Sequence, residues 1–242
     1  MCGRFVLATD AQSLQMHFNL TALPEGVIVA RYNIAPTQPV AVITNQAPQT
    51  LTFQKWGLIP SWSKDPSIAS SLINARAETL HEKPSFRTAF KRRRCLIPAS
   101  GFYEWGKGEG KAKQPYYIHL ADNQVFAFAG LWETWSSPDG DTVETCTIIT
   151  TEPNDLIRPL HHRMAVILDP EDYDLWLSPD ELPPMALMPL LNSYPQETMR
   201  YHPVSPMVNN VRNDSPECIK PLIPPEQSPL LTRYGVIIGN SE

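Results

Sequence analysis

Cysteine, glycine and long apolar runs are all scarce in this chain of 242 residues. The four cysteines lie far apart, with no C-x-x-C pair and no histidine spacing typical of a zinc site, so neither a disulfide framework nor a structural metal centre is expected. No apolar run approaches the roughly 18 residues that a membrane-spanning helix requires. The first residues also lack the charged-then-apolar pattern of a secretion signal. We therefore expect a cytoplasmic protein with reduced thiols and no contact with a membrane.

Positive charge is also in deficit, since 20 Lys and Arg face 25 Asp and Glu and the net charge is −5. This balance argues against indiscriminate nucleic-acid binding by bulk charge, but it leaves room for a local basic face. The run Lys91-Arg92-Arg93-Arg94 is one candidate. Four consecutive cations either cover a solvated face or contact phosphates, and the sequence leaves both open.

Proline is abundant, with 25 residues against 11 glycines, and the apolar pattern suggests many short strands joined by rigid loops. The alternation at 40–44 and 51–56 predicts a pair of strands, while 31–37 is predicted to be a loop. Thr9 and Gln12 resemble a capping box at the start of a helix of about two turns. The prolines and polar residues near the C-terminus predict a domain at 1–224 and a tail at 225–242.

A cysteine at position two can become the N-terminal residue, because cysteine is small enough for the initiator methionine to be removed. Cys2 would then carry an α-amine and a thiol on adjacent carbons. These groups titrate near ~8 and ~8.5, so each has a usable unprotonated fraction near neutral pH. Such an aminothiol can form a Schiff base with an aldehyde and then close a thiazolidine ring. The plain alternative is that position two holds cysteine without any such role.

The segment Gly101-Phe102-Tyr103-Glu104-Trp105 is the most informative interior motif. On a strand, Phe102 and Glu104 face one side and Tyr103 and Trp105 face the other. If the Glu104 side is buried, desolvation raises the pKa of its carboxyl group and makes it a useful general acid. If the strand lies at an edge, Glu104 points to water instead.

Histidines and tryptophans mark further candidate positions. His161 and His162 are adjacent, and in an extended segment only one of the two can face a shared site. Either histidine can equally be a structural residue. Trp56 and Trp62 either pack in the core or form a stacking surface for bases.

Taken together, the motifs resemble those of the SRAP family, the SOS-response-associated peptidases that crosslink to abasic sites in DNA. The resemblance extends from residue 1 to about 213 and rests on segments that occur in the family's order: Met1-Cys2-Gly3-Arg4-Phe5, Tyr32-Asn33-Ile34-Ala35-Pro36-Thr37, Trp56-Gly57-Leu58-Ile59-Pro60, Asn74-Ala75-Arg76-Ala77-Glu78-Thr79, Gly101-Phe102-Tyr103-Glu104-Trp105, His161-His162-Arg163-Met164 and His202-Pro203-Val204. It implies an α+β fold of mostly antiparallel β structure, a distorted open barrel or paired sheets with short peripheral helices. Two departures are Ala165 where the family has proline and His162 where an acidic residue is common.

The resemblance also implies a function and a set of site residues. Mature Cys2 would bond to the aldehyde of an abasic sugar in single-stranded DNA as a thiazolidine that shields the lesion, after autoproteolytic removal of Met1. The catalytic residues implied are Cys2, Asn74, Glu104 and His161, and the DNA-binding residues are Arg4, Asn33, Pro36, Thr37, Arg76, Thr150 and Arg163. Within this set, Glu104 would move protons and His161 would assist ring opening. We expect a monomer that needs no metal or cofactor.

Two other functions remain open at this stage. A thiol hydrolase could use Cys2, His161 and Asn74 to cleave an amide bond. A binding module for single strands would hold intact and abasic DNA alike without a covalent bond. The α-amine of Cys2 separates the first alternative from crosslinking, because a thiol protease does not need that amine.

Overall fold

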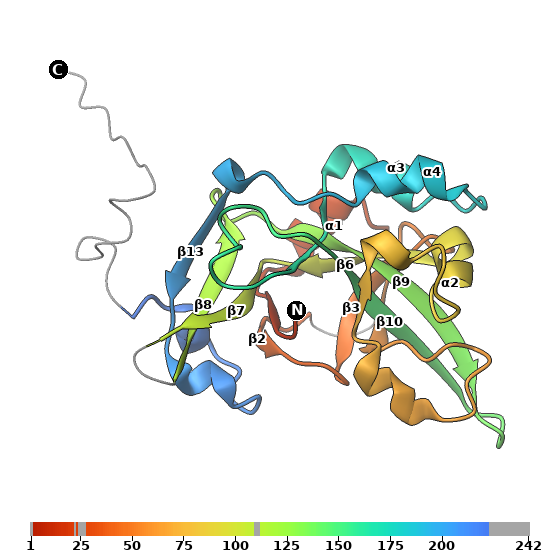
Figure 1. The fold of residues 1–242 in the computed structure, drawn as a ribbon, viewed down its shortest axis with the longest axis horizontal. Helices are drawn as coiled ribbons and strands as arrows, with labels where there is room; N and C mark the ends of the chain where they lie inside the picture. Colours follow the sequence, from red (N-terminus) through yellow and green to blue (C-terminus); the bar gives the residue numbers. More distant parts are fainter. Residues whose placement is uncertain (1, 22, 24–27, 109–111, 223–242) are drawn as a thin grey trace.

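The computed structural model describes residues 2–21, 23, 28–108 and 112–222, which form two sheets with short helices around them (Figure 1). The predicted tail at 225–242 lies outside the described residues, so that boundary stays a prediction. The α+β class with mostly antiparallel strands is confirmed. No helix in the described part of the chain is long and apolar enough to cross a membrane.

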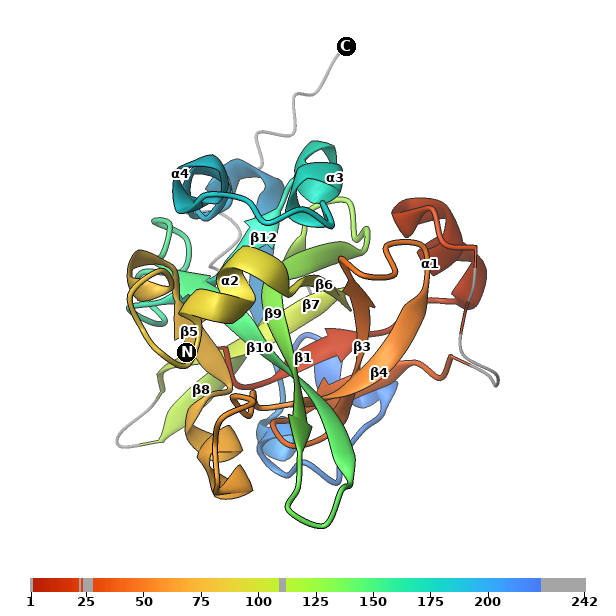
Figure 2. The same ribbon diagram turned by 90° about the vertical axis from the view of Figure 1, so that its right-hand side faces the viewer.

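Five strands of the larger sheet close into a barrel. They are β3 (Pro39–Thr44), β4 (Leu51–Trp56), β6 (Arg94–Ala99), β9 (Phe126–Ser136) and β10 (Thr142–Thr151). The order is β10-β4-β3-β6-β9, and the long β9–β10 hairpin closes the ring, with only β10 and β4 running parallel. The barrel is therefore closed, where the expectation was a distorted open barrel or paired sheets. Three short strands attach to it: β5 (Asn74–Arg76), β11 (Met164–Ala165) and β12 (Ile167–Leu168) (Figure 2).

The smaller sheet has the strand order β13-β8-β7-β1-β2. Its members are β1 (Phe5–Leu7), β2 (Arg31–Ile34), β7 (Gly101–Lys107), β8 (Lys113–Leu120) and β13 (Met199–Pro203). The segment 31–34, predicted as part of a loop, is thus a strand that pairs with β1. Because β1 lies between β2 and β7, the residues just before it are drawn into the protein interior.

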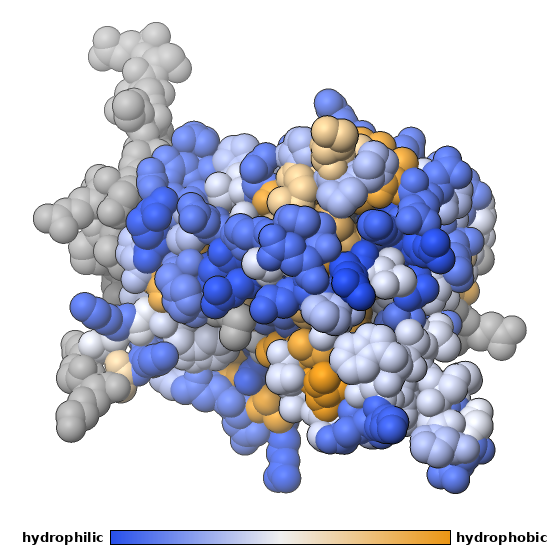
Figure 3. Space-filling model, turned by 45° about the vertical axis from the view of Figure 1, so that its right-hand side comes forward, coloured by the Kyte–Doolittle hydropathy of each residue, from blue (hydrophilic) through white to orange (hydrophobic). Residues whose placement is uncertain are grey.

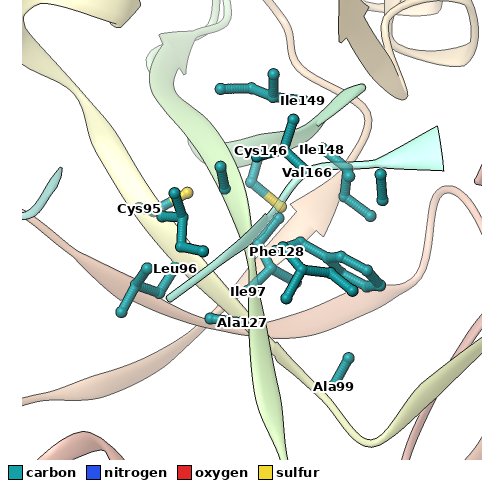
Figure 4. Packing of buried hydrophobic residues seen from close by; sticks show 14 of the residues in the cluster. Cys95, Leu96, Ile97, Ala99, Ala127, Phe128, Cys146, Ile148, Ile149 and Val166 are labelled. Atoms are coloured by element: carbon teal, nitrogen blue, oxygen red, sulfur yellow. The ribbon is translucent and has the colours of Figure 1, made fainter. Parts of the chain in front are cut away.

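Apolar side chains from both sheets form the core. Inside the barrel, Cys95, Ile97, Phe128 and Cys146 are completely or almost completely buried (Figure 4). Gly130 lies among them, and a Cβ at this position would approach Cys95 Sγ to 2.8 Å and Ile97 Cδ1 to 2.9 Å. The barrel therefore has no room for a side chain at that crossing of β6, β9 and β10.

The helices are short and lie at the periphery. The α-helices are α1 (Ala11–Phe18), α2 (Arg87–Arg92), α3 (Tyr173–Trp176) and α4 (Pro184–Leu187). The 3-10 segments are η1 (Pro66–Ser71), η2 (Ala77–Thr79), η3 (Pro170–Asp172), η4 (Met188–Leu190), η5 (Gln196–Thr198), η6 (Pro206–Asn209) and η7 (Pro216–Ile219). Helix α1 is confirmed, but its N-cap is Asp10 and not Thr9, because the Asp10 carboxylate accepts from the Ser13 N–H at 2.8 Å. Exposed apolar side chains of α3 and α4 lie near the top of Figure 3, and hydrophilic residues dominate the middle of that face.

The side chains of the basic run 91–94 do not share one exposed surface. Arg94 is completely buried, and its guanidinium donates to backbone carbonyls of five residues: Phe90, Lys91, Trp176, Ser178 and Asp180. The prediction of a shared cationic face is therefore wrong for Arg94, since carbonyl groups distant in the sequence compensate its burial. Arg92 and Arg93 form ion pairs with Glu181 and Glu133.

Candidate functional site

The site is built around Cys2, which lies three residues before the start of β1 and is completely buried. Asn74, the first residue of β5, donates its side-chain amide to the Cys2 carbonyl oxygen at 2.9 Å. Strand β5 is held in place because it pairs in parallel with β10, with Asn74 opposite Ile148. Trp56 also donates its indole N–H to the Ile73 carbonyl at 2.8 Å, so this buried tryptophan belongs to the core.

The surroundings of the Cys2 thiol keep it protonated. Burial, with a further contribution from the negative charge of Glu104, raises the thiol pKa to about 12. The thiol of Cys2 therefore cannot supply a thiolate at neutral pH unless a nearby base takes its proton. The same coupling shows that Glu104 lies close enough to Cys2 for their charges to interact.

The carboxylate of Glu104 is suited to accept the proton of the Cys2 thiol. Its strand, β7, has β1 on one side and β8 on the other, and the residue is only 3% exposed. Burial raises the pKa of its carboxyl group to about 7, which gives it both protonation states near neutral pH. The prediction of an inward-facing carboxyl group is thus confirmed, and the alternative of an edge strand is wrong.

His161 lies on the turn before β11 and is half-buried, whereas His162 is exposed. The two rings stack with centroids 4.3 Å apart. His161 Nδ1 lies 3.0 Å from the backbone nitrogen and 3.2 Å from the carbonyl oxygen of Arg163, so either tautomer of the neutral imidazole finds a hydrogen-bond partner there. Burial lowers the His161 pKa to about 4, and the ring is neutral at physiological pH.

The His161 turn lies against the strand that carries Glu104. Gly106 of β7 has no side chain, and a Cβ there would be 2.9 Å from Leu160 Cδ2. The charge of Lys113, at the start of β8, also acts secondarily to burial on the pKa of both Glu104 and His161. Cys2, Asn74 and Glu104 are therefore brought together directly, and His161 joins them through the packing of its turn on β7.

Arg4 is fixed by a network that begins at Asn33. Its Nη1 donates to Asn33 Oδ1 and to the Val208 carbonyl, both at 2.7 Å, and its guanidinium carbon lies 5.8 Å from the centre of the Trp105 ring. Asn33 is completely buried and donates its side-chain amide to carbonyl groups of the segment 208–213. Asn33 therefore positions Arg4, and a direct contact of Asn33 with DNA stays a prediction.

The other expected DNA-binding residues differ in exposure. Thr37 and Arg76 are exposed and Pro36 is half-buried. Thr37 has a φ of 71°, a left-handed conformation that turns the chain after β2, and its N–H donates to the Trp56 carbonyl at 2.8 Å. Thr150 is completely buried, and its hydroxyl donates to the Ala75 carbonyl at 3.4 Å. Their contacts with DNA remain predictions.

Arg163 forms a bidentate ion pair with Glu78. Its Nη1 and Nη2 atoms lie 2.8 and 2.9 Å from the two carboxylate oxygens, and Nη2 also donates to the Thr150 carbonyl at 2.6 Å. Burial opposes ionisation of Glu78, but the Arg163 contacts outweigh it and lower the pKa of this carboxyl group. The pair ties η2 to the His161 turn, and the role of Arg163 as a phosphate ligand stays a prediction.

Glu78 and Lys113 were missed as site residues by sequence reasoning. Glu78 lies in the 74–79 motif, two residues after Arg76, but its main partner, Arg163, is distant in the sequence, so no local signal identifies it. Lys113 has no such signal, because its proximity to the site depends on the pairing of β8 with β7. No group of three His, Cys, Asp or Glu side chains within the described residues is arranged to hold a metal ion.

Residues 1–211 match the family model described as SOS response associated peptidase (SRAP). The chain belongs to this family. It is 46% identical over 222 residues to a protein of Bacillus subtilis named abasic site processing protein YoqW, covering 91% of this chain and 99% of YoqW. It is also 34% identical over 233 residues to the abasic site processing protein HMCES of Gallus gallus, with 83% of this chain and 68% of HMCES covered.

Two solved structures have a similar fold. A crystal structure of a protein from Bacteroides thetaiotaomicron matches with a TM-score of 0.81 at 28% identity, covering 92% of this chain and 100% of that one. A second, from Bordetella bronchiseptica, matches with a TM-score of 0.72 at 26% identity, covering 84% of this chain and 100% of that one. These two proteins thus share the fold of this chain.

Proposed function

We propose that this protein captures abasic sites in single-stranded DNA through a covalent thiazolidine at Cys2. The names of its SRAP relatives support a role in processing abasic sites. The observation that carries the proposal is the burial of Cys2 beside Glu104, a carboxyl group whose pKa of about 7 suits proton transfer. As a protein that acts on DNA, it would work in the cytoplasm at the nucleoid.

The reaction that leads to the thiazolidine has three steps. First, water hydrolyses the Met1–Cys2 amide bond, releasing methionine and giving Cys2 a free α-amine. Second, that amine attacks the aldehyde of the ring-opened abasic sugar and expels water, which forms a Schiff base. Third, the Cys2 sulfur adds to the imine carbon while the thiol proton ends on nitrogen, and the thiazolidine ring closes.

Each neighbouring residue has a distinct role in these steps. Glu104 accepts the proton of the Cys2 thiol and returns protons to the leaving water, since its carboxyl group exchanges protons near pH 7. His161, whose ring is neutral at physiological pH, assists opening of the sugar ring by hydrogen bonding. Asn74 holds the Cys2 carbonyl, so that the reacting atoms keep one orientation.

The DNA strand would pass along residues next to this centre. Arg4, Arg76 and Arg163 would face its phosphates, and Pro36 and Thr37 would wedge between nucleotides, with Asn33 and Thr150 supporting the pocket. These positions fit a single strand or a junction better than an intact duplex. The protein would act as a monomer, without a metal or cofactor.

A thiol peptidase is the less favoured function. Such an enzyme needs a thiolate with a lowered pKa, usually beside a histidine that can carry the proton. Here burial raises the pKa of Cys2 to about 12 and lowers that of His161 to about 4. The environment thus favours a nitrogen nucleophile at Cys2 over a sulfur nucleophile.

A denaturing gel tests the proposal. The protein, with its N-terminal residue established by mass spectrometry, is mixed with a single-stranded oligonucleotide that bears one abasic site. The expected result is a shifted band that survives heating, forms without a reducing agent and disappears in Cys2→Ala. A protein with Cys2 as its first residue that gives no such band would contradict the proposal.

A further inference from the structure

Three exposed basic side chains occur every four residues in the segment that follows η2. Lys83 donates its N–H to the Thr79 carbonyl at 3.0 Å, and Arg87 donates to the Lys83 carbonyl at 2.9 Å. Helix α2 continues this spacing to Lys91. Helix α2 begins at Arg87, so Arg87 and Lys91 lie about 6 Å apart along its axis and on the same face, and Lys83 lies one hydrogen-bonded turn before the helix. We call Lys83, Arg87 and Lys91 the basic track.

The basic track faces solvent because the other side of the segment is buried. Phe86, Ala89 and Phe90 are 7%, 2% and 0% exposed and pack against the core. All three cations of the track are exposed. Hydrophilic residues dominate the middle of the face in Figure 3, which is consistent with this arrangement.

The charges of the basic track are not neutralised locally. Among the residues that the structure describes, none forms an ion pair with Lys83, Arg87 or Lys91, whereas the neighbouring Arg92 pairs with Glu181 at 2.8 Å. The acidic residues of the same stretch are Glu78, which is paired with Arg163, and Glu82, which lies 3.5 Å from His81. The track is therefore a local concentration of positive charge on a protein of net charge −5.

The basic track follows the site residues along the chain. Asn74 contacts Cys2, the exposed Arg76 ends β5, and η2 leads directly to Lys83. A strand that leaves Cys2 along Arg76 would follow the same stretch of chain that carries the basic track.

We propose that the basic track binds phosphate groups of the DNA strand that flanks the lesion. This inference rests on the proposed function, because the occupant is the strand that carries the abasic sugar. Exposed cations spaced at four-residue intervals suit a polyanion, and each phosphate contact releases counterions from the strand. The track gives affinity without base specificity, as capture of a lesion in any sequence requires.

Salt dependence of binding tests this inference. Arg87→Gln/Lys91→Gln is compared with Arg200→Gln/Lys220→Gln, a control that also removes one arginine and one lysine but lies at β13 and after η7, away from α2. The ligand is a single-stranded oligonucleotide with a tetrahydrofuran in place of the abasic sugar, which has no aldehyde and cannot crosslink. Affinity is measured by fluorescence anisotropy from 50 to 200 mM salt.

For a single strand, each lost phosphate contact lowers the slope of log affinity against log salt by about 0.7. The track variant should therefore lose about 1.4 from the slope, so that parent affinity falls about sevenfold more than variant affinity over this fourfold salt range. The control should keep the parent slope. Equal slopes for the two variants would overturn the proposal. If the double variant does not fold, the single variants should each lose about 0.7.

These experiments can refute either proposal without refuting the other. Covalent capture is scored on the denaturing gel with the true abasic oligonucleotide, and the basic track is scored by the salt slope with the tetrahydrofuran ligand. If the parent protein never crosslinks, the proposed function is contradicted, but the salt dependence of its affinity for the tetrahydrofuran ligand still tests the basic track. A parent that crosslinks, with equal slopes for the variants, contradicts only the basic track.

Discussion

The side-chain amide of Asn74 donates a hydrogen bond to the carbonyl oxygen of Cys2 at 2.9 Å. This contact joins β5 of the barrel system to the residue that precedes β1 of the smaller sheet, so the site lies where the two sheets meet. Cys2 is thereby held from the barrel side by Asn74 and faces Glu104 from the sheet side.

Loss of this contact should slow capture without unfolding the protein. A hydrogen bond contributes about 0.5–1.5 kcal/mol, so Asn74→Ala should lower the crosslinking rate about 2- to 12-fold. The exposed Asn192, whose amide donates to the Pro189 carbonyl at 2.6 Å, offers the control Asn192→Ala, which should leave the rate unchanged. Single-turnover gels measure both rates, and equal rates for the two variants would refute the positioning role of Asn74.

The buried carboxyl group of Glu104 should make stability depend on pH. Its pKa in the folded protein, about 7, is raised above the ordinary value of 4.5, so the stability it permits is full below pH 4.5 and is lost as pH rises through 7. Glu104→Gln removes this loss, and its melting temperature should rise relative to the parent between pH 4.5 and 8. The exposed Glu152→Gln serves as control. A Glu104→Gln difference that is constant with pH would contradict the burial effect.

Substitutions of His161 and of His162 should have different effects on the crosslinking rate. His161 is half-buried and lies within hydrogen-bond distance of the Arg163 backbone, while His162 is exposed. His161→Ala should lower the crosslinking rate by about 10²-fold, the lower end of what a positioned proton-transfer group contributes, and His162→Ala should change it less than twofold. Because the pKa of His161 is about 4, its contribution should not vary between pH 6 and 8. Loss of activity in His162→Ala alone would reverse the assignment.

The Arg163–Glu78 pair should contribute to stability as well as to the site. Arg163 is 8% exposed, so Arg163→Ala leaves the Thr150 carbonyl and Glu78 without their donor. We expect a loss of about 1–3 kcal/mol in the free energy of unfolding. Arg76→Ala, at an exposed position, should cost less than about 0.5 kcal/mol. Urea unfolding measures both, and equal costs would show that the pair contributes nothing.

Local patterns predicted what depends on local physics. The alternation in 51–56 identified β4, because side chains on a strand alternate between faces, whereas the same rule left Glu104 open between an inward and a solvent-facing position. The candidate role of the cysteine at position two could also be predicted, because the chemistry of an N-terminal aminothiol depends only on the position of that residue in the chain. Family resemblance supplied Asn74, which no pattern marks.

Long-range contacts could not be predicted in this way. Closure of the barrel depends on β10 pairing with β4, and the fate of Arg94 depends on carbonyl groups more than 80 residues away in the sequence. Asn33 gave no sign of burial, because its partners lie in the segment 208–213. A polar residue in a sequence does not reveal whether its hydrogen bonds will be made with water or with distant backbone.

The most direct test of covalent capture by Cys2 is to block its α-amine while leaving its thiol in place. A variant that retains one uncleaved residue before Cys2 is compared with the protein whose first residue is Cys2, using intact-mass measurement after incubation with an abasic oligonucleotide and no reducing agent. Our account predicts an adduct equal to protein plus oligonucleotide minus one water for free Cys2, and none for the blocked variant. An equal yield of adduct from the blocked variant would contradict thiazolidine formation and require a different nucleophile.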